Sequence, residues 1–130
     1  METNTLLVGL AGVLASAAPI LIAVIGETIT ERAGVINLSM NGTILLSAMG
    51  GFAVALRTDS IVLGFLTGML IGALVALVIA FSSITLRQSQ VAVGFVLALL
   101  CRDLAYVLGV PFMNEPGPRL PAWSIPVLKD

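Results

Sequence analysis

The sequence predicts an all-α integral membrane protein with about four transmembrane helices, and three observations support this prediction. Of its 130 residues, 58% are hydrophobic and only 10% are charged. A soluble domain carries about 25% charged residues, which it needs to cover its surface. Long runs without any ionisable residue also alternate with short polar breaks. Backbone groups in lipid must pair within their own segment, so we expect these apolar runs to be helices.

The charged residues divide the chain into apolar segments. The first three are at least as long as the ~20 residues that a helix needs to cross the hydrocarbon layer. We expect helices at about residues 6–25, 33–56, 61–86 and 91–110, followed by a Pro-rich tail at 111–130. The fourth segment contains Arg102 and Asp103. Because these two residues are adjacent, we expect them to point in different directions and to need separate partners or water.

The first segment is predicted to be a retained helix and not a cleaved signal peptide. The small residues at 15–17 resemble a cleavage site, but the chain begins Met-Glu-Thr-Asn and lacks the basic region of a signal peptide. The apolar run also continues well beyond residue 17.

The break between the first two segments has local chemistry of its own. Thr28 and Glu31 have the spacing of a capping box, which would start the second helix. We therefore predict a helix-entry turn formed by Glu27, Thr28, Glu31 and Arg32. Proton coupling through Glu27 is the alternative role, because a carboxylate at a membrane boundary can have a raised pKa.

The second segment carries polar side chains that a simple anchor does not need. Asn37 and Asn41 lie one helical turn apart, and Ser39 lies between them on another face. An amide in hydrocarbon is costly unless it is hydrogen-bonded or lines a wet cavity. These residues are candidates for a solute path, and ties to neighbouring helices are the other interpretation that the sequence leaves open.

Small residues recur every four positions in two segments, which places them on one helix face and lets another backbone approach closely. The third segment has Gly64, Gly68 and Gly72, continued by Ala76 and Ala80, and the second has Ser47, Gly51 and Ala55. We expect the Gly64, Gly68 and Gly72 face to be a packing surface, either within the chain or between two copies.

The composition excludes several other functions. The chain has one cysteine, no histidine and a net charge of −1, so we expect no disulfide within the chain, no His-based metal site and no nucleic-acid partner. Cys101 lies in an apolar run and is interpreted as an inert helix residue. No nucleotide-binding loop, paired catalytic carboxylates or metal-ligand cluster is present in the sequence, so we predict neither enzymatic activity nor a cofactor.

The run from Gly26 to Gly42, GETITERAGVINLSMNG, resembles a signature of ATP-binding-cassette (ABC) importer permeases. The resemblance is to the family that serves branched-chain amino acids, simple sugars and nucleosides, and it is closest to the nucleoside and simple-sugar permeases. Residues 86–91 with Gly94, and the tail residues 125–128, fit the same family in the same order. Asn41 departs from the pattern, because the family more often has Glu there. Family members also continue with further membrane helices.

This resemblance implies a multi-pass permease of the prokaryotic cytoplasmic (inner) membrane that imports a small polar solute. It implies a second permease subunit, cytoplasmic ATP-binding subunits that hydrolyse the ATP, and an extracytoplasmic solute-binding protein. The resemblance covers the N-terminal part of such a permease. We therefore expect this chain to be an N-terminal fragment, a truncated gene product or a half-permease that requires a second chain.

Two other classes of membrane protein remain open at this point. One is a small four-helix exporter coupled to protons, although Glu27 lies at the end of an apolar run and not in mid-helix, which argues against it. The other is a membrane subunit that scaffolds a complex without transporting anything. Its helices would pack in the same way, so a change in solute flux is what separates a scaffold from a permease.

Overall fold

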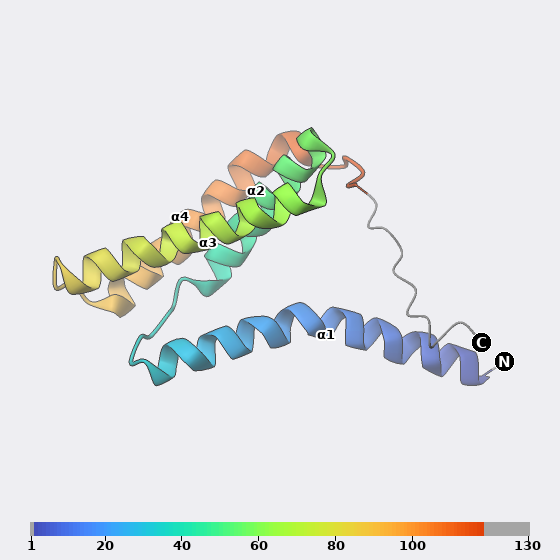
Figure 1. Cartoon of the computed structure of the whole chain (residues 1–130), viewed down its shortest axis with the longest axis horizontal. Helices are drawn as coiled ribbons and strands as arrows, with labels where there is room; N and C mark the ends of the chain where they lie inside the picture. Colours follow the sequence, from blue (N-terminus) through green and yellow to red (C-terminus); the bar gives the residue numbers. More distant parts are fainter. Residues whose placement is uncertain (1, 119–130) are drawn as a thin grey trace. The chain divides into compact units, whose positions relative to one another are not determined.

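The computed structural model describes residues 2–118, so the last part of the predicted Pro-rich tail lies outside the described residues. The elements are helices throughout this part of the chain (Figure 1). They are α1 (Glu2–Arg32), α2 (Met40–Thr58), α3 (Ile61–Ile84), α4 (Gln90–Gly109) and the short 3-10 helix η1 (Val110–Phe112). The predicted all-α class is confirmed.

Three helical stretches of the described chain are long and apolar enough to cross a membrane: Thr5–Arg32, Ile61–Ile84 and Gln90–Phe112. The second predicted span is not among them. Helix α2 has 19 residues and includes the charged Arg57 and the polar Asn41. Residues 33–39, which were predicted to belong to this helix, are not helical, so α2 begins only at Met40.

The chain divides into two compact units, residues 1–37 and 38–130. Helix α1 is the main element of the first unit. It is one continuous helix of 31 residues with Pro19 inside it, and it bends near its middle (Figure 1). A proline inside a helix removes one backbone hydrogen bond and crowds the preceding turn, which accounts for a bend at this place.

The predicted helix-entry turn at Glu27, Thr28, Glu31 and Arg32 is instead the last part of α1. The helix ends beyond it, at Gly34, whose φ of +80° is a left-handed conformation that glycine adopts without strain. Gly34 N donates to Glu31 O at 2.9 Å, and Val35 N donates to Thr30 O at 2.9 Å. This pair of bonds is a Schellman motif, so these residues close a helix and do not open the next one.

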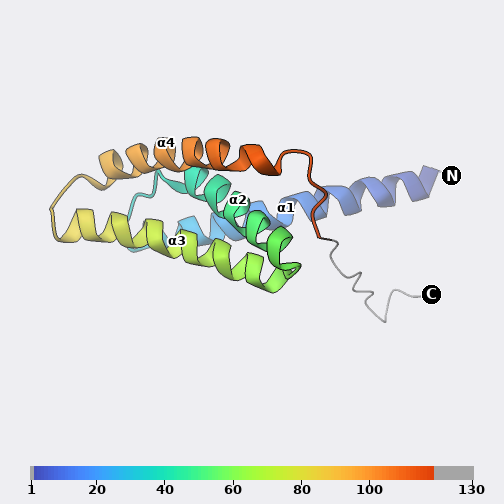
Figure 2. The ribbon, with the colours of Figure 1, turned by 90° about the horizontal axis from the view of Figure 1, so that it is seen from above.

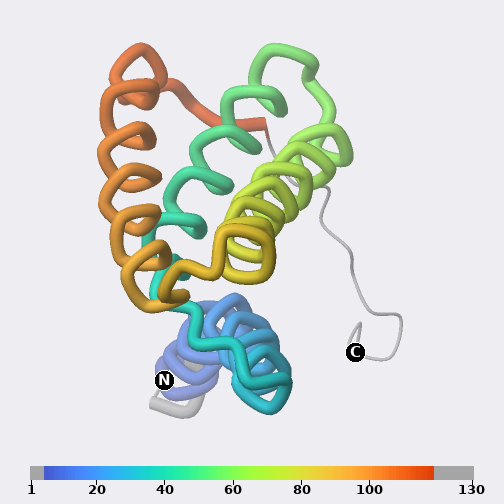
Figure 3. The backbone as a smooth tube through the Cα atoms, turned by 90° about the vertical axis from the view of Figure 1, so that its left-hand side faces the viewer, coloured from blue at the N-terminus to red at the C-terminus, as the bar shows by residue number. Residues whose placement is uncertain are grey.

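Helices α2, α3 and α4 form the second unit. Helix α2 makes extensive contacts with both α3 and α4, and it crosses between them (Figures 2 and 3). Short connections with serine caps reverse the chain direction. Ser60 Oγ accepts from Leu63 N at 3.4 Å at the start of α3, and Ser89 Oγ accepts from Ala92 N at 3.4 Å at the start of α4.

The buried core of this unit is small. Val75 and Ile79 of α3 pack with Cys101 of α4, and partly buried apolar side chains surround them. Most of the other large apolar side chains are exposed. Exposure on this scale suits helices that face lipid or further membrane segments, as expected for a membrane protein.

Candidate functional site

The three predicted path residues differ in their surroundings. Ser39 is only 1% exposed. Thr43 Oγ1 lies 2.9 Å from the Ser39 carbonyl oxygen, to which it donates, and 3.4 Å from Ser39 Oγ. Asn37 is half-buried, whereas Asn41 on the first turn of α2 is exposed. Ser39 therefore stabilises the start of α2 from a position closed to a solute, and Asn41 is the most accessible of the three.

Leu38, which lies just before α2, packs against α4. A Cβ atom built on Gly94 would lie 3.3 Å from Leu38 N and 3.5 Å from Leu38 Cβ. Gly94 thus gives Leu38 room to approach the α4 backbone. Leu38 and Gly94, which each belong to a stretch that resembles the permease family, meet at this contact.

Helix α2 also meets the backbone of α4 directly. A Cβ atom on Gly42 would overlap the backbone of Ala98, so only glycine fits at this position. This contact between Gly42 and Ala98 was not predicted from the sequence. The available signal was the four-residue spacing of Gly94 and Ala98, which places two small residues on one face of α4.

The small residues of α2 face those of α3. A Cβ atom on Gly64 would lie 2.7 Å from Gly51 O and 2.8 Å from Ala55 Cβ. The contact loosens along α3, because a Cβ atom on Gly68 would lie 3.3 Å from Ser47 O and one on Gly72 would lie 4.0 Å from Ser47 Oγ. The two predicted rows therefore form one interface, defined here as the α2–α3 seam, and it is tightest at Gly64.

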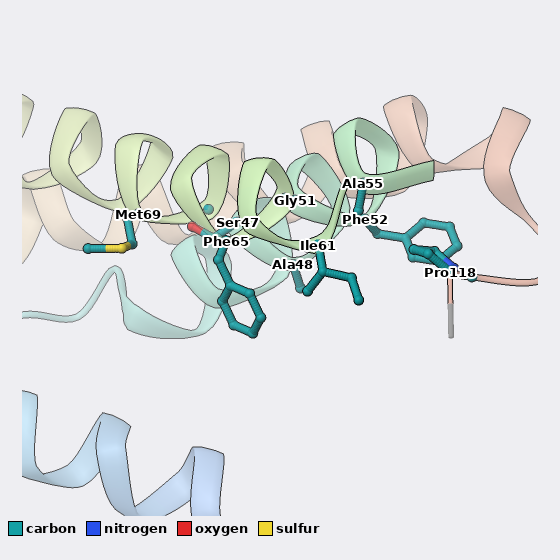
Figure 4. A pocket seen from close by; sticks show the side chains of 12 residues that line it. Ser47, Ala48, Gly51, Phe52, Ala55, Ile61, Phe65, Met69 and Pro118 are labelled. Atoms are coloured by element: carbon teal, nitrogen blue, oxygen red, sulfur yellow. The ribbon is translucent and has the colours of Figure 1, made fainter. Parts of the chain in front are cut away.

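A groove of about 590 Å³ lies along this seam (Figure 4). Its larger lining side chains are apolar: Phe52, Ile61, Phe65 and Met69. The one hydroxyl group in its wall belongs to Ser47, whose enclosed Oγ has no hydrogen-bond partner among the described residues. Such a wall suits an apolar side chain or lipid chain and not a hydroxyl-rich solute.

The two charged residues of α4 interact with each other. Both Nε and Nη2 of Arg102 lie 3.1 Å from Asp103 Oδ1. The expectation that they need separate partners is wrong for this reason, since the long arginine side chain can fold back along the helix to its neighbour. Both side chains remain exposed, at 49% and 65%.

A further charged residue, Arg57, contacts an aromatic ring. The Arg57 guanidinium lies 5.3 Å from the centre of the Phe112 ring, which is cation–π distance and ties η1 to the end of α2. Among the residues that the structure describes, no group of three or more His, Cys, Asp or Glu side chains could hold a metal ion.

Comparison with known proteins identifies the family. The family model described as "Branched-chain amino acid transport system / permease component" matches residues 9–127. No solved structure is significantly similar to the chain.

Two curated relatives extend the comparison. The chain is 38% identical over 113 residues to the "Putative glucose ABC transporter permease protein" of Haloferax volcanii, a match that covers 87% of this chain and 34% of the relative. It is 27% identical over 137 residues to the "Nucleoside ABC transporter permease protein" of Lactococcus lactis, covering 98% of this chain and 43% of the relative. The chain therefore spans less than half the length of either relative.

The match over residues 9–127, the two permease relatives and the membrane-length helices all agree. This chain therefore belongs to the branched-chain amino acid transport system permease family of ABC transporter components, and it is a multi-pass protein of the prokaryotic cytoplasmic membrane.

Proposed function

We propose that this chain forms part of the translocation path of an ATP-driven importer for a small polar solute. The family match over residues 9–127 carries the proposal. A simple sugar or a nucleoside is favoured over a branched-chain amino acid, because the two relatives are named as glucose and nucleoside permeases.

In this proposal, the chain supplies membrane helices and other components supply energy and solute. A second permease subunit completes the path, since solute sites in transporters usually lie between repeated halves. Cytoplasmic ATP-binding subunits hydrolyse the ATP, and an extracytoplasmic solute-binding protein delivers the cargo. The permease itself shifts between conformations that the ATPase favours differently, without catalysing a reaction.

We propose Asn37 and Asn41 as path residues, and Ser39 as a residue that supports the start of α2. Amide groups both donate and accept hydrogen bonds, which suits hydroxyl groups. Asn41 is exposed on the first turn of α2, and the buried Ser39 is hydrogen-bonded to that turn through Thr43. Replacing Asn37 and Asn41 with Leu in the complete transporter should reduce uptake, and normal uptake at normal expression would leave these residues a packing role only.

The Gly64, Gly68 and Gly72 face is proposed to keep α3 in close contact with α2 while the permease changes conformation. Support comes from the close approach of the two helices, because a Cβ atom built on Gly64 would lie only 2.7 Å from Gly51 O. The residues Glu27, Thr28, Glu31 and Arg32 are proposed to stabilise the end of α1, where Thr28 Oγ1 donates to Val24 O at 2.8 Å.

The test is solute uptake by cells that lack this chain. Radiolabelled glucose, uridine and leucine are supplied separately to the deletion strain and to the same strain carrying the gene again. The proposal predicts loss of glucose or uridine uptake, restoration by the gene, and unchanged leucine uptake. Loss of leucine uptake alone would assign a branched-chain amino acid.

The same strains separate the other classes of membrane protein. Uptake by an ABC importer should stop when ATP is depleted and should persist when only the proton gradient is collapsed. Efflux that depends on the proton gradient would instead indicate the small exporter. No change in any flux would indicate the scaffold.

A further inference from the structure

The exposed charges of α4 lie at the middle of a candidate membrane span. This span is Gln90–Phe112, 23 residues long, and its central residue is Cys101. Arg102 and Asp103 follow directly after it. Their side chains are 49% and 65% exposed, so the other described residues of their own unit, which begins at residue 38, do not cover them.

Lipid is a poor environment for these two groups. A charged residue at the centre of a membrane helix is strongly unfavourable when it faces lipid. The arginine cannot reach the membrane surface, because Arg102 lies ten residues before the end of the span, about 15 Å along the helix axis. The surface that carries these groups therefore faces water or protein.

The ion pair leaves much hydrogen-bonding capacity unused. Arginine has five N–H donors, and two of its nitrogens, Nε and Nη2, contact the same oxygen, Asp103 Oδ1. Among the residues that the structure describes, neither side chain has another polar partner. A guanidinium and a carboxylate with spare donors and acceptors can bind a molecule that carries several hydroxyl groups.

An aromatic ring lies on the same helix face. Tyr106 follows Arg102 by four residues and Asp103 by three, and it is 61% exposed. The face that packs inside the protein is a different one, since Cys101 is 3% exposed and Ala105 is 8% exposed. The charged pair and the ring thus form an open surface that packing within this unit does not use.

We propose that Arg102, Asp103 and Tyr106 bind a neutral, hydroxyl-rich solute, such as a sugar ring, in a water-filled cavity at the membrane midplane. The carboxylate would accept hydrogen bonds from hydroxyl groups, the guanidinium would donate to ring or hydroxyl oxygens, and the tyrosine ring would cover an apolar C–H face. This inference rests on the proposed import function, and it moves the principal solute contacts from α2 to α4. Transporter solute sites typically lie at this depth.

The first test is the concentration dependence of uptake by the complete transporter, measured with labelled glucose and labelled uridine. Asp103→Asn and Tyr106→Leu should each raise KM roughly tenfold or more, because they remove a charge-assisted hydrogen bond or the stacking ring. The matched control is Asp59→Asn, an exposed residue in the α2–α3 connection, which should leave KM unchanged. Unchanged KM in both α4 variants would overturn the site.

A charge exchange separates solute binding from simple ion pairing. The double variant Arg102→Asp with Asp103→Arg can still form the pair. If pairing were the only role, the double variant would transport normally. The proposed site instead predicts a KM as high as in Asp103→Asn, because the donor and the acceptor now lie at exchanged positions.

A second measurement does not depend on which solute is carried. Leu99 lies one turn before Asp103 on the same face, and Leu74 is an exposed residue near the middle of α3. In a Cys101→Ala background, Leu99→Cys should react with a water-soluble cationic methanethiosulfonate reagent, and Leu74→Cys should not. An unreactive Leu99→Cys would overturn the cavity and its site. Uptake of neither labelled solute by the wild type would instead refute the proposed solute class, while the Leu99 result would still decide on the cavity.

Discussion

Helix α4 has two faces with opposite chemistry. One face is built from small residues, and there the helix touches its neighbours backbone to backbone, at Gly94 with Leu38 and at Ala98 with Gly42. The other face carries Asp103 and Tyr106, and Arg102 lies at its border with the packing face because it follows Ala98 by four residues; all three side chains are exposed. Lipid is as apolar as a leucine side chain, so apolarity alone cannot select a neighbouring helix in a membrane. Small residues therefore select the neighbouring helices, and the exposed charges mark a surface that this unit leaves uncovered.

The largest expected effect on folding comes from the contact between α2 and the small face of α4. Gly42→Ala should strongly reduce the amount of folded permease, because the added Cβ atom overlaps the Ala98 backbone and a backbone cannot move aside as a flexible side chain can. Overpacking of this kind costs about 1–3 kcal/mol and occasionally more. The folded fraction is measured by size-exclusion chromatography of detergent-solubilised protein.

The matched control for Gly42→Ala is Gly72→Ala. An added Cβ atom at Gly72 would meet only Ser47 Oγ, at an ordinary distance of 4.0 Å. This variant should fold at least as well as the wild type, since alanine favours a helix by about 1 kcal/mol over glycine. Equal folded fractions for the two variants would show that the α2–α4 contact is looser than described.

The second largest loss of stability is expected at the α2–α3 seam. Gly64→Ala should destabilise the permease by about 1–2 kcal/mol, because the clash with Gly51 O and Ala55 Cβ exceeds the gain in helix propensity. The shift in thermal unfolding midpoint in detergent checks this prediction. A higher midpoint than the wild type would mean that α2 and α3 can move apart without loss.

Substitution on the exposed face of α4 should have little effect on folding. The Arg102–Asp103 pair is about half exposed, and exposed pairs contribute about 0–1 kcal/mol. Asp103→Asn should therefore change the unfolding midpoint by less than Gly64→Ala does. A collapse of the folded fraction in Asp103→Asn would indicate that this pair stabilises the fold, contrary to the comparison of the two faces.

The smallest effect is expected at Ser47. Its enclosed Oγ has no partner among the described residues, so Ser47→Ala removes a polar atom without breaking a hydrogen bond. We expect the midpoint to stay the same or to rise slightly, within about 1 kcal/mol. A marked loss of stability would reveal a bound water or a polar partner at this position.

The sequence was sufficient to predict the helical membrane class, because this class follows from the length and spacing of the apolar runs. The end of α1 was predicted wrongly. Thr28 and Glu31 have the spacing of a capping box, which would start a helix. The helix that already contains them instead continues and ends at Gly34, whose φ is +80°. Such a choice depends on a backbone conformation that residue spacing alone does not determine.

Contacts between helices were harder to predict than the helices themselves. The small rows on α2 and α3 indicated close packing, but the spacing of each row does not say which partner it meets. The Gly42–Ala98 contact joins residues far apart in the chain, and the spacing of Gly94 and Ala98 indicates a face of small residues without saying which helix packs on it. The Arg102–Asp103 pairing depends on the side-chain conformation of arginine, which the sequence does not contain.

The most direct test of the two faces of α4 compares uptake per folded molecule in Asp103→Asn, on the exposed face, and in Gly42→Ala, which disturbs the packing face at Ala98. Solute uptake and the amount of folded permease are both measured in the same membranes. The solute is one that the wild type takes up, and it is supplied at a concentration below its KM. We expect uptake per folded molecule to fall about tenfold in Asp103→Asn, because a charge-assisted hydrogen bond to the solute is lost, and to stay near wild type in Gly42→Ala. Equal values in the two variants would contradict the division of α4 into a packing face and a solute face.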